Sequence, residues 1–117
     1  SIRLQDLKER PQQASGDLAA RVQAARERQR RRFDADHPSP VNASLTAAAI
    51  YRDCPVAPAG QALLDAAFER LGLSARALHR VLKVARTIAD LAAADRIESA
   101  HLAEAIQYRS LDRRMAR

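Results

Sequence analysis

The stretch Gly72–Ala94 (GLSARALHRVLKVARTIADLAAA) constrains the fold most, because it has the pattern of one long helix with a wide apolar arc. Ser74 is an N-cap signal, since its hydroxyl can accept a hydrogen bond from the free amides of the first turn. Two adjacent apolar stripes recur at spacings of three and four: Leu78, Leu82, Ala85, Ala89 and Ala92, and beside them Val81, Val84, Ile88 and Leu91. An arc this wide needs cover from more than one side, so the sequence predicts a central helix near 75–94.

The rest of that helix forms a polar strip made of Arg76, Arg80, Lys83, Thr87 and Asp90. Arg76 breaks a local rule, because a cation in the first turn faces the positive end of the helix dipole. Local rules are often broken at functional sites, and an arginine beside free helix amides is suited to holding a phosphate. The alternative is a surface arginine that points into water.

Composition favours an all-α chain, because Ala, Leu and Arg dominate its 117 residues while Gly, aromatic and β-branched residues are few. No apolar run reaches the ~20 residues of a membrane span, and no signal peptide pattern is present. The single Cys54 has no partner for an internal disulfide, which indicates a reducing compartment. We therefore expect a cytoplasmic protein.

The net charge of +6 favours acidic partners such as nucleic acid, nucleotide phosphates or acidic protein surfaces. Five arginines crowd the end of the predicted helix 17–33: Arg26, Arg28, Arg30, Arg31 and Arg32. They are candidates for contacts to phosphates or DNA, with a salt-dependent affinity. The alternative is a solvated helix end whose charges complement the dipole, since Phe33 is the one aromatic platform nearby.

The remaining pattern predicts a bundle of four or five helices. Pro11 and Gly16 favour a linker or mobile lead-in over residues 1–16, ahead of a helical domain over 17–113 and a basic tail over 114–117. Besides helix 17–33 and the central helix, the pattern predicts helices over 43–53, 58–71 and 100–109, the last capped by Ser99.

Gly72 is expected to end helix 58–71 in a tight turn, so that this helix packs beside the central one. Ile97 is expected to enter the core, as are several large apolar residues: Leu45, Tyr51, Leu63, Leu64, Phe68, Leu71, Leu102, Ile106 and Tyr108.

The sequence lacks the motifs typical of catalytic, phosphate-binding and metal-binding sites. The chain has no Gly-rich phosphate loop ending in Lys-Ser/Thr, no nucleophile triad, and no paired carboxylates in an apolar setting. His37, His79, His101 and Cys54 are isolated from one another, so no metal ligand set is predicted. The isolated chain is therefore not expected to be an enzyme.

Four segments carry a family resemblance: GLSARALHRVLKVARTIADL, RIESAHLAEAIQYRSLDR, RVQAARERQRRRF and VNASL. Over about residues 17–113 the chain resembles the C-terminal helical lid domain of bacterial magnesium chelatase-like AAA+ ATPases of the ComM (YifB) type. The resemblance implies a small helical lid that follows an αβα ATPase core carrying the Walker A loop.

The resemblance also implies site residues and partners. A sensor 2 arginine near the start of a lid helix reaches the γ-phosphate of ATP, and Arg76 is the matching position, with Arg80 one turn further as a weaker candidate. ATP and Mg²⁺ would be bound mainly by the core, and no cofactor is expected on the isolated domain. Neighbouring subunits of a ring, expected to be a hexamer, and DNA are implied partners of the parent motor, and no membrane is expected. The remaining alternative is a basic helical module that binds nucleic acid or protein.

Overall fold

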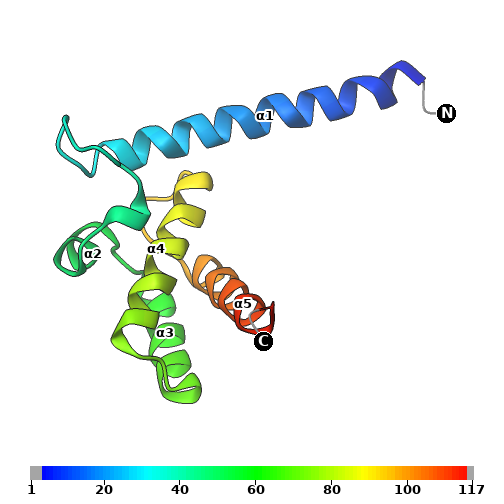
Figure 1. The fold of residues 1–117 in the computed structure, drawn as a ribbon. Coiled ribbons are helices and arrows are strands. Elements are labelled where there is room, and N and C mark those ends of the chain that lie inside the picture. Colours follow the sequence, from blue (N-terminus) through cyan, green and yellow to red (C-terminus); the bar gives the residue numbers. More distant parts are fainter. Residues whose placement is uncertain (1–3, 116–117) are drawn as a thin grey trace.

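The computed structural model describes the backbone of residues 4–115 and the side chains of residues 15–109. Within that part the chain is all-helical, which confirms the predicted fold class (Figure 1). The elements are α1 (Leu4–Arg30), η1 (Asn42–Ser44), α2 (Ala47–Asp53), α3 (Pro58–Leu71), α4 (Ala75–Leu91) and α5 (Ser99–Met115). None of these helices is long and apolar enough to cross a bilayer.

Helix α4 is the centre of the bundle, as its wide apolar arc predicts. It contacts α1, η1, α2 and α5. Its residues Val81, Leu82, Ala85 and Ala89 are nearly inaccessible to solvent and belong to the main hydrophobic cluster. Ser74 Oγ accepts from the Ala77 amide at 3.1 Å, which confirms the predicted cap.

The end of α4 differs from the prediction. The helix stops at Leu91 rather than Ala94, because Ala93 takes a left-handed conformation with φ 56°. The Ala94 amide then donates back to Ala89 O at 2.8 Å, which closes the last turn. Sequence reasoning missed this stop because alanine rarely takes that conformation, and no glycine marks the position.

Helix α1 has different bounds from the helix predicted over 17–33. A single helix of 27 residues runs through Pro11 and Gly16, so residues 4–16 are helical and the helix ends at Arg30 rather than at 33. The helix formers on both sides, such as Ala14, Ala19 and Ala20, propagate the helix past two weak positions. In Figure 1 the N-terminal half of α1 projects away from the bundle as an arm, and residues 15–20 are all exposed.

Helix α3 begins and ends where predicted, but its packing differs. Gly72 ends it with φ 59°, and Leu73 is buried behind the turn. Helix α3 packs mainly against α5 rather than along α4, so the predicted side-by-side pairing across this turn is wrong. Its C-terminal end therefore extends beyond the bundle and leaves Phe68 and Leu71 exposed, contrary to the prediction.

Three further local expectations are corrected. Helix α2 starts at Ala47 rather than at residue 43, and Thr46 caps it by accepting from the Ala49 amide at 3.2 Å. Helix α5 starts at Ser99 itself, after Glu98, whose carbonyl accepts from the His101 amide and whose amide donates to His101 Nδ1 at 3.0 Å. Tyr51 and Tyr108, predicted to point inward, are 68% and 48% exposed.

The connections before α3 and before α5 are joined by a short bridge. Ala57 N donates to Ile97 O at 2.9 Å, and Ile97 N donates to Pro55 O at 2.8 Å. Ile97 is fully buried, as predicted. Gly60 lies against this bridge, and an added Cβ would meet side-chain atoms of Leu102 and Val56 at 3.0 Å. The bridge thus fixes the start of α3 against α5.

Candidate nucleotide-sensing site

Arg76 occupies the second position of α4, two residues after the cap. Its side chain is exposed, and no hydrogen bond or ion pair joins it to any residue the structure describes. The first turn of α4 holds no acidic residue that would neutralise it. The guanidinium is thus available beside the positive end of a helix, the setting in which an external anion offsets both charges.

The polar strip behind Arg76 divides into an exposed part and an internal part. Arg80 is exposed and lies one turn beyond Arg76. Lys83 Nζ donates to Ala43 O at 3.2 Å and so fastens η1 to α4. Thr87 and Asp90, which the sequence placed on the same free edge, instead join a buried network. The exposed cationic part of the strip is therefore its leading half.

Asp90 is the centre of that network and its side chain is fully buried. Arg32 donates to both carboxylate oxygens of Asp90 at 2.6 Å. Arg86 Nε donates to Asp90 Oδ1 at 3.2 Å, and Asn42 Nδ2 donates to Oδ2 at 2.9 Å. One carboxylate therefore holds together the end of α1, η1 and the last turns of α4.

Arg86 is a buried charge that sequence reasoning missed. It is 1% exposed, and it donates to Asp95 O at 2.9 Å and to Ala94 O at 2.6 Å. Burial lowers the pKa of Arg86, and the Asp90 carboxylate opposes that shift. Its spacing of four from Asp90 on one helix was the signal that could have identified the pair.

The five arginines near the end of α1 differ in whether they bond to the bundle or face solvent. Arg32 lies in the internal network with a side chain 13% exposed, so its guanidinium is committed to Asp90 and is not a surface grip for phosphate. Arg28 donates to Ala93 O at 3.2 Å and to Asp95 Oδ1 at 3.4 Å, which ties α1 to the end of α4. Arg30 pairs with Glu27 at 2.9 Å on the surface, while Arg26 and Arg31 are exposed. The outward-facing members are therefore Arg26, Arg30 and Arg31.

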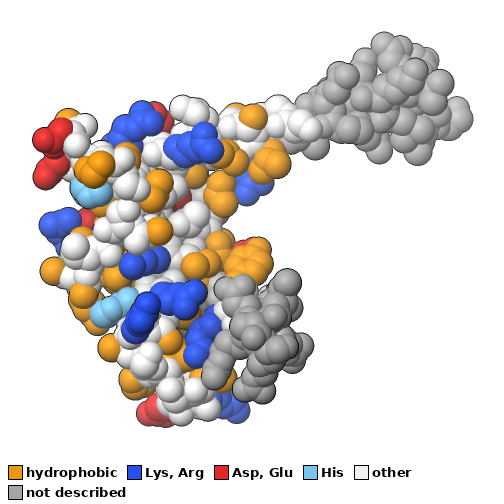
Figure 2. Space-filling model, viewed as in Figure 1, with side chains coloured by type: hydrophobic (Ala, Val, Ile, Leu, Met, Phe, Trp, Pro, Cys, Tyr) orange, Lys and Arg blue, Asp and Glu red, His pale blue; other side chains and the backbone are white. Residues whose placement is uncertain are grey.

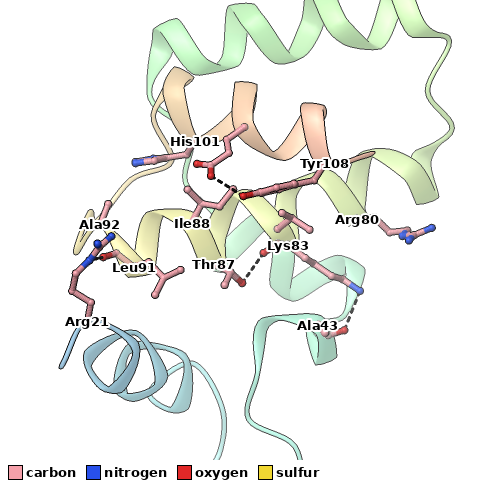
Figure 3. Close-up of a pocket in the computed structure, with 12 residues that line it drawn as sticks. Arg21, Ala43, Arg80, Lys83, Thr87, Ile88, Leu91, Ala92, His101 and Tyr108 are labelled. Carbon is pink, nitrogen blue, oxygen red and sulfur yellow. Dashed lines mark hydrogen bonds between the residues drawn. The ribbon is translucent and has the colours of Figure 1, made fainter. Parts of the chain in front are cut away.

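A groove of about 770 Å³ lies where α4, α1 and α5 meet (Figure 3). Val84, Ile88, Leu91 and Tyr108 contribute its apolar lining. Arg21 Nε donates to Leu91 O at 3.3 Å at one end of the groove, and Arg80 lies at the other. Tyr108 Oη donates to Glu104 at 3.0 Å, and this bond raises the pKa of Tyr108. The sequence does not reveal this groove, because its lining comes from helices that are far apart in the chain.

The histidines and the cysteine are explained by local packing. The His37 ring lies 4.6 Å from the Phe33 ring, and Tyr51 Oη lies 3.2 Å from His79 Nε2. Cys54 is buried, which raises the pKa of its thiol to about 11. Across the described residues, no group of three or more potential metal ligands is gathered.

Residues 12–109 match the family described as magnesium chelatase, subunit ChlI C-terminal. The chain belongs to this family. It is 48% identical over 73 residues to the competence protein ComM of Haemophilus influenzae, a match that covers 62% of this chain. It is 42% identical over 103 residues to the uncharacterized protein YifB of Escherichia coli, covering 88% of this chain, and 43% identical over 101 residues to YifB of Salmonella typhimurium, covering 86%. No solved structure gives a significant match.

These matches confirm the predicted resemblance and support a helical AAA+ lid domain of the ComM/YifB type. The matched regions amount to 14% of the length of ComM and 19% of the length of each YifB protein. The chain therefore aligns with less than a fifth of the length of each of these relatives.

Proposed function

We propose that this chain is the lid of an ATPase and that Arg76 is its sensor 2 arginine, directed at the γ-phosphate of ATP bound by a preceding core domain. The observation that carries the proposal is the position of Arg76: exposed, unpaired within the described residues, and in the first turn of a capped helix. Membership of the magnesium chelatase C-terminal family supports the proposed ATPase setting, in which an arginine at this position would meet a phosphate.

The energetics favour a sensing role over a binding role. An exposed arginine beside a helix N-terminus pays ~0.3–1 kcal/mol in the absence of an anion. A charge-assisted bond to a phosphate oxygen reverses that cost and is roughly twice as strong as a neutral hydrogen bond. One such contact contributes little affinity by itself, but it discriminates ATP from ADP, which lacks the γ-phosphate. Mg²⁺ and most of the nucleotide contacts belong to the core in this proposal.

Rigidity supports a mechanical reading of the same proposal. The buried Asp90 network joins the last turns of α4 to the end of α1. A displacement of the N-terminal end of α4 on nucleotide binding would therefore also move α1, the helix that precedes the rest of the bundle. In this account the nucleotide state sets the lid position, and the lid position sets contacts between subunits of a ring acting on DNA.

ATP turnover in the full-length parent tests the proposal. We expect Arg76→Ala to lower kcat by ten-fold or more without lowering the thermal unfolding temperature, because Arg76 makes no hydrogen bond or ion pair with the described residues and its charge is unfavourable at the start of α4. Arg96→Ala is the matched control, since Arg96 is also a surface arginine and its pair with Glu98 is long, at 3.9 Å. Wild-type turnover in Arg76→Ala would exclude the sensor role.

We propose as a second candidate function direct contact with DNA through Arg26, Arg30 and Arg31, which are exposed at or just beyond the end of α1. Such contacts predict an affinity of this chain for duplex DNA that falls steeply with salt. A titration of DNA at low and at physiological salt tests it, with the triple alanine variant of these residues as the control. Absence of binding at low salt would exclude this candidate.

A further inference from the structure

Two exposed apolar surfaces of opposite charge character lie on different ends of the bundle. We propose that they bind each other between copies of this chain: the groove of one copy receives the C-terminal end of α3 from the next. This inference rests on the ring assembly in the proposed function and names the surfaces that would form it. It is independent of what Arg76 contacts.

The receiving surface is the groove between α4, α1 and α5. Its apolar lining is partly solvent-exposed, with Val84 39% and Tyr108 48% accessible. Around this lining stand three cations, Arg21, Arg80 and Lys83, against one carboxylate, Glu104, which already accepts a bond from Tyr108. Figure 3 shows Arg80 directed away from the other labelled side chains, and Figure 2 shows the molecule hollowed beneath α1. The groove therefore suits an apolar segment with acidic neighbours.

The inserted surface is the last two turns of α3, which we call the α3 ridge: Asp65, Phe68, Glu69 and Leu71. Phe68 and Leu71 are 43% and 45% exposed and lie one turn apart on the helix. Asp65 and Glu69, also exposed, are one turn apart and form an acidic stripe beside them. Arg70 follows Glu69 at a further 100° around the helix, away from Phe68. The α3 ridge thus offers apolar side chains and carboxylates, which suit an apolar groove surrounded by cations.

The placement of the two surfaces decides the type of contact. In Figure 1 the α3 end lies at the bottom of the bundle, and the end of α4 that helps form the groove lies beneath α1 at the top. Two grooves facing each other would bring cations together, and two ridges would bring carboxylates together. The favourable contact is therefore groove to ridge, a head-to-tail interface that produces a ring when its rotation closes.

The contact is expected to be weak between two isolated copies. One helix end in one groove buries less than the ~1,200 Å² of a stable standard interface. Its apolar centre contributes in proportion to the area removed from water, while its rim charges mainly affect orientation and association rate. In a closed ring every subunit makes the contact twice, so weak contacts reinforce one another.

Sedimentation velocity of this 117-residue chain, without nucleotide, from ~10 μM to ~1 mM tests the proposal. We expect a sedimentation coefficient that rises with concentration for the wild type. Phe68→Glu places a charge on the apolar part of the α3 ridge and Val84→Glu places one in the groove, and each should weaken association at least ten-fold. Tyr51→Glu is the control, because Tyr51 is 68% exposed and lies in neither surface.

Mixing the two defective chains provides the sharper test. The Phe68→Glu chain retains an intact groove and the Val84→Glu chain retains an intact ridge, so an equimolar mixture should form heterodimers that grow no further. A charge exchange, Arg80→Glu combined with Glu69→Arg, should restore association lost in Arg80→Glu alone. Circular dichroism of each variant separates loss of contact from loss of fold.

The proposal is overturned if the wild type stays monomeric at ~1 mM, if both variants associate like the wild type, or if their mixture remains monomeric. Since no nucleotide is present, each of these results would leave the sensor role of Arg76 standing. Conversely, normal ATP turnover in Arg76→Ala would remove the sensor role and leave this interface standing.

Discussion

Arg32, just beyond the end of α1, donates both terminal nitrogens of its guanidinium to the two carboxylate oxygens of Asp90 in the last turn of α4, each at 2.6 Å. This two-pronged pair is mostly shielded from water, with side-chain exposures of 13% and 0%. It links two elements that are 58 positions apart in the sequence. Together with the bonds of Arg21 to Leu91 O and of Arg28 to Ala93 O, this pair fixes the end of α1 against α4.

The first prediction concerns Asp90→Asn, which leaves Arg32 and Arg86 without their carboxylate. Removing one partner of a buried pair costs ~3–5 kcal/mol, because the remaining charge is desolvated and uncompensated. Urea unfolding should show a loss of that size. Asp95→Asn is the control: the Asp95 side chain is 95% exposed and its single bond to Arg28 is 3.4 Å long, so its loss should stay within ~1 kcal/mol. Equal losses in the two variants would contradict the role given to Asp90.

The second prediction separates two glycines in helices. Gly60→Ala should lower the unfolding free energy by ~1–3 kcal/mol, because the added methyl meets Leu102 and Val56 at 3.0 Å. Gly16→Ala should cause no loss and should increase the helical circular dichroism signal, because an added Cβ meets nothing within 4 Å and alanine favours a helix. A stable Gly60→Ala variant would show that α3 is not fixed against α5 as described.

The third prediction compares two serines with the same apparent signal in the sequence. Ser74→Ala should cost ~1 kcal/mol, since the hydroxyl caps α4 through the Ala77 amide. Ser99→Ala should be close to neutral, since the Glu98 carbonyl and the His101 ring make the first bonds of α5. Chemical denaturation of both variants measures the difference, and a larger loss in Ser99→Ala would refute the assignment of the α5 start.

The fourth prediction concerns alkaline pH. Burial raises the pKa of Cys54 from the usual 9.0 to about 11, so the folded state keeps the thiol neutral where the unfolded chain ionises. The associated stability is fully present below pH ~9 and is lost as pH rises toward ~11, a change of about 2–3 kcal/mol. The pH dependence of unfolding should therefore be shallower in Cys54→Ala than in the wild type over this window. Parallel curves for the two proteins would contradict the burial of this thiol.

The fold was predictable where a pattern repeats over several turns or where a residue has one clear role. The apolar arc of α4, its Ser74 cap, the left-handed Gly72 and the buried Ile97 all follow from such signals. The predicted end of α4 is wrong because side-chain contacts outside the local sequence pattern determine where this helix ends. Ala93 is left-handed in a turn whose carbonyls bind Arg28 and Arg86, and neither contact is visible in local sequence.

The site was predictable only in its exposed half. Arg76 and Arg80 lie on the surface at the leading end of α4, as the polar strip indicates. The trailing half differs because charge in a sequence does not reveal burial. Asp90 and Arg32 are both polar and both appeared solvent-facing, yet their mutual pairing makes burial tolerable. The groove could not be predicted, since it depends on where α1 and α5 cross α4.

The most direct test of the account is the preference of the full-length parent for a non-hydrolysable ATP analogue over ADP, measured as a ratio of Kd values. The sensor role predicts that Arg76→Ala reduces this preference about ten-fold, which corresponds to ~1.4 kcal/mol, while ADP affinity stays at the wild-type value and thermal stability does not fall. An unchanged ratio in Arg76→Ala would contradict the claim that this arginine recognises the γ-phosphate.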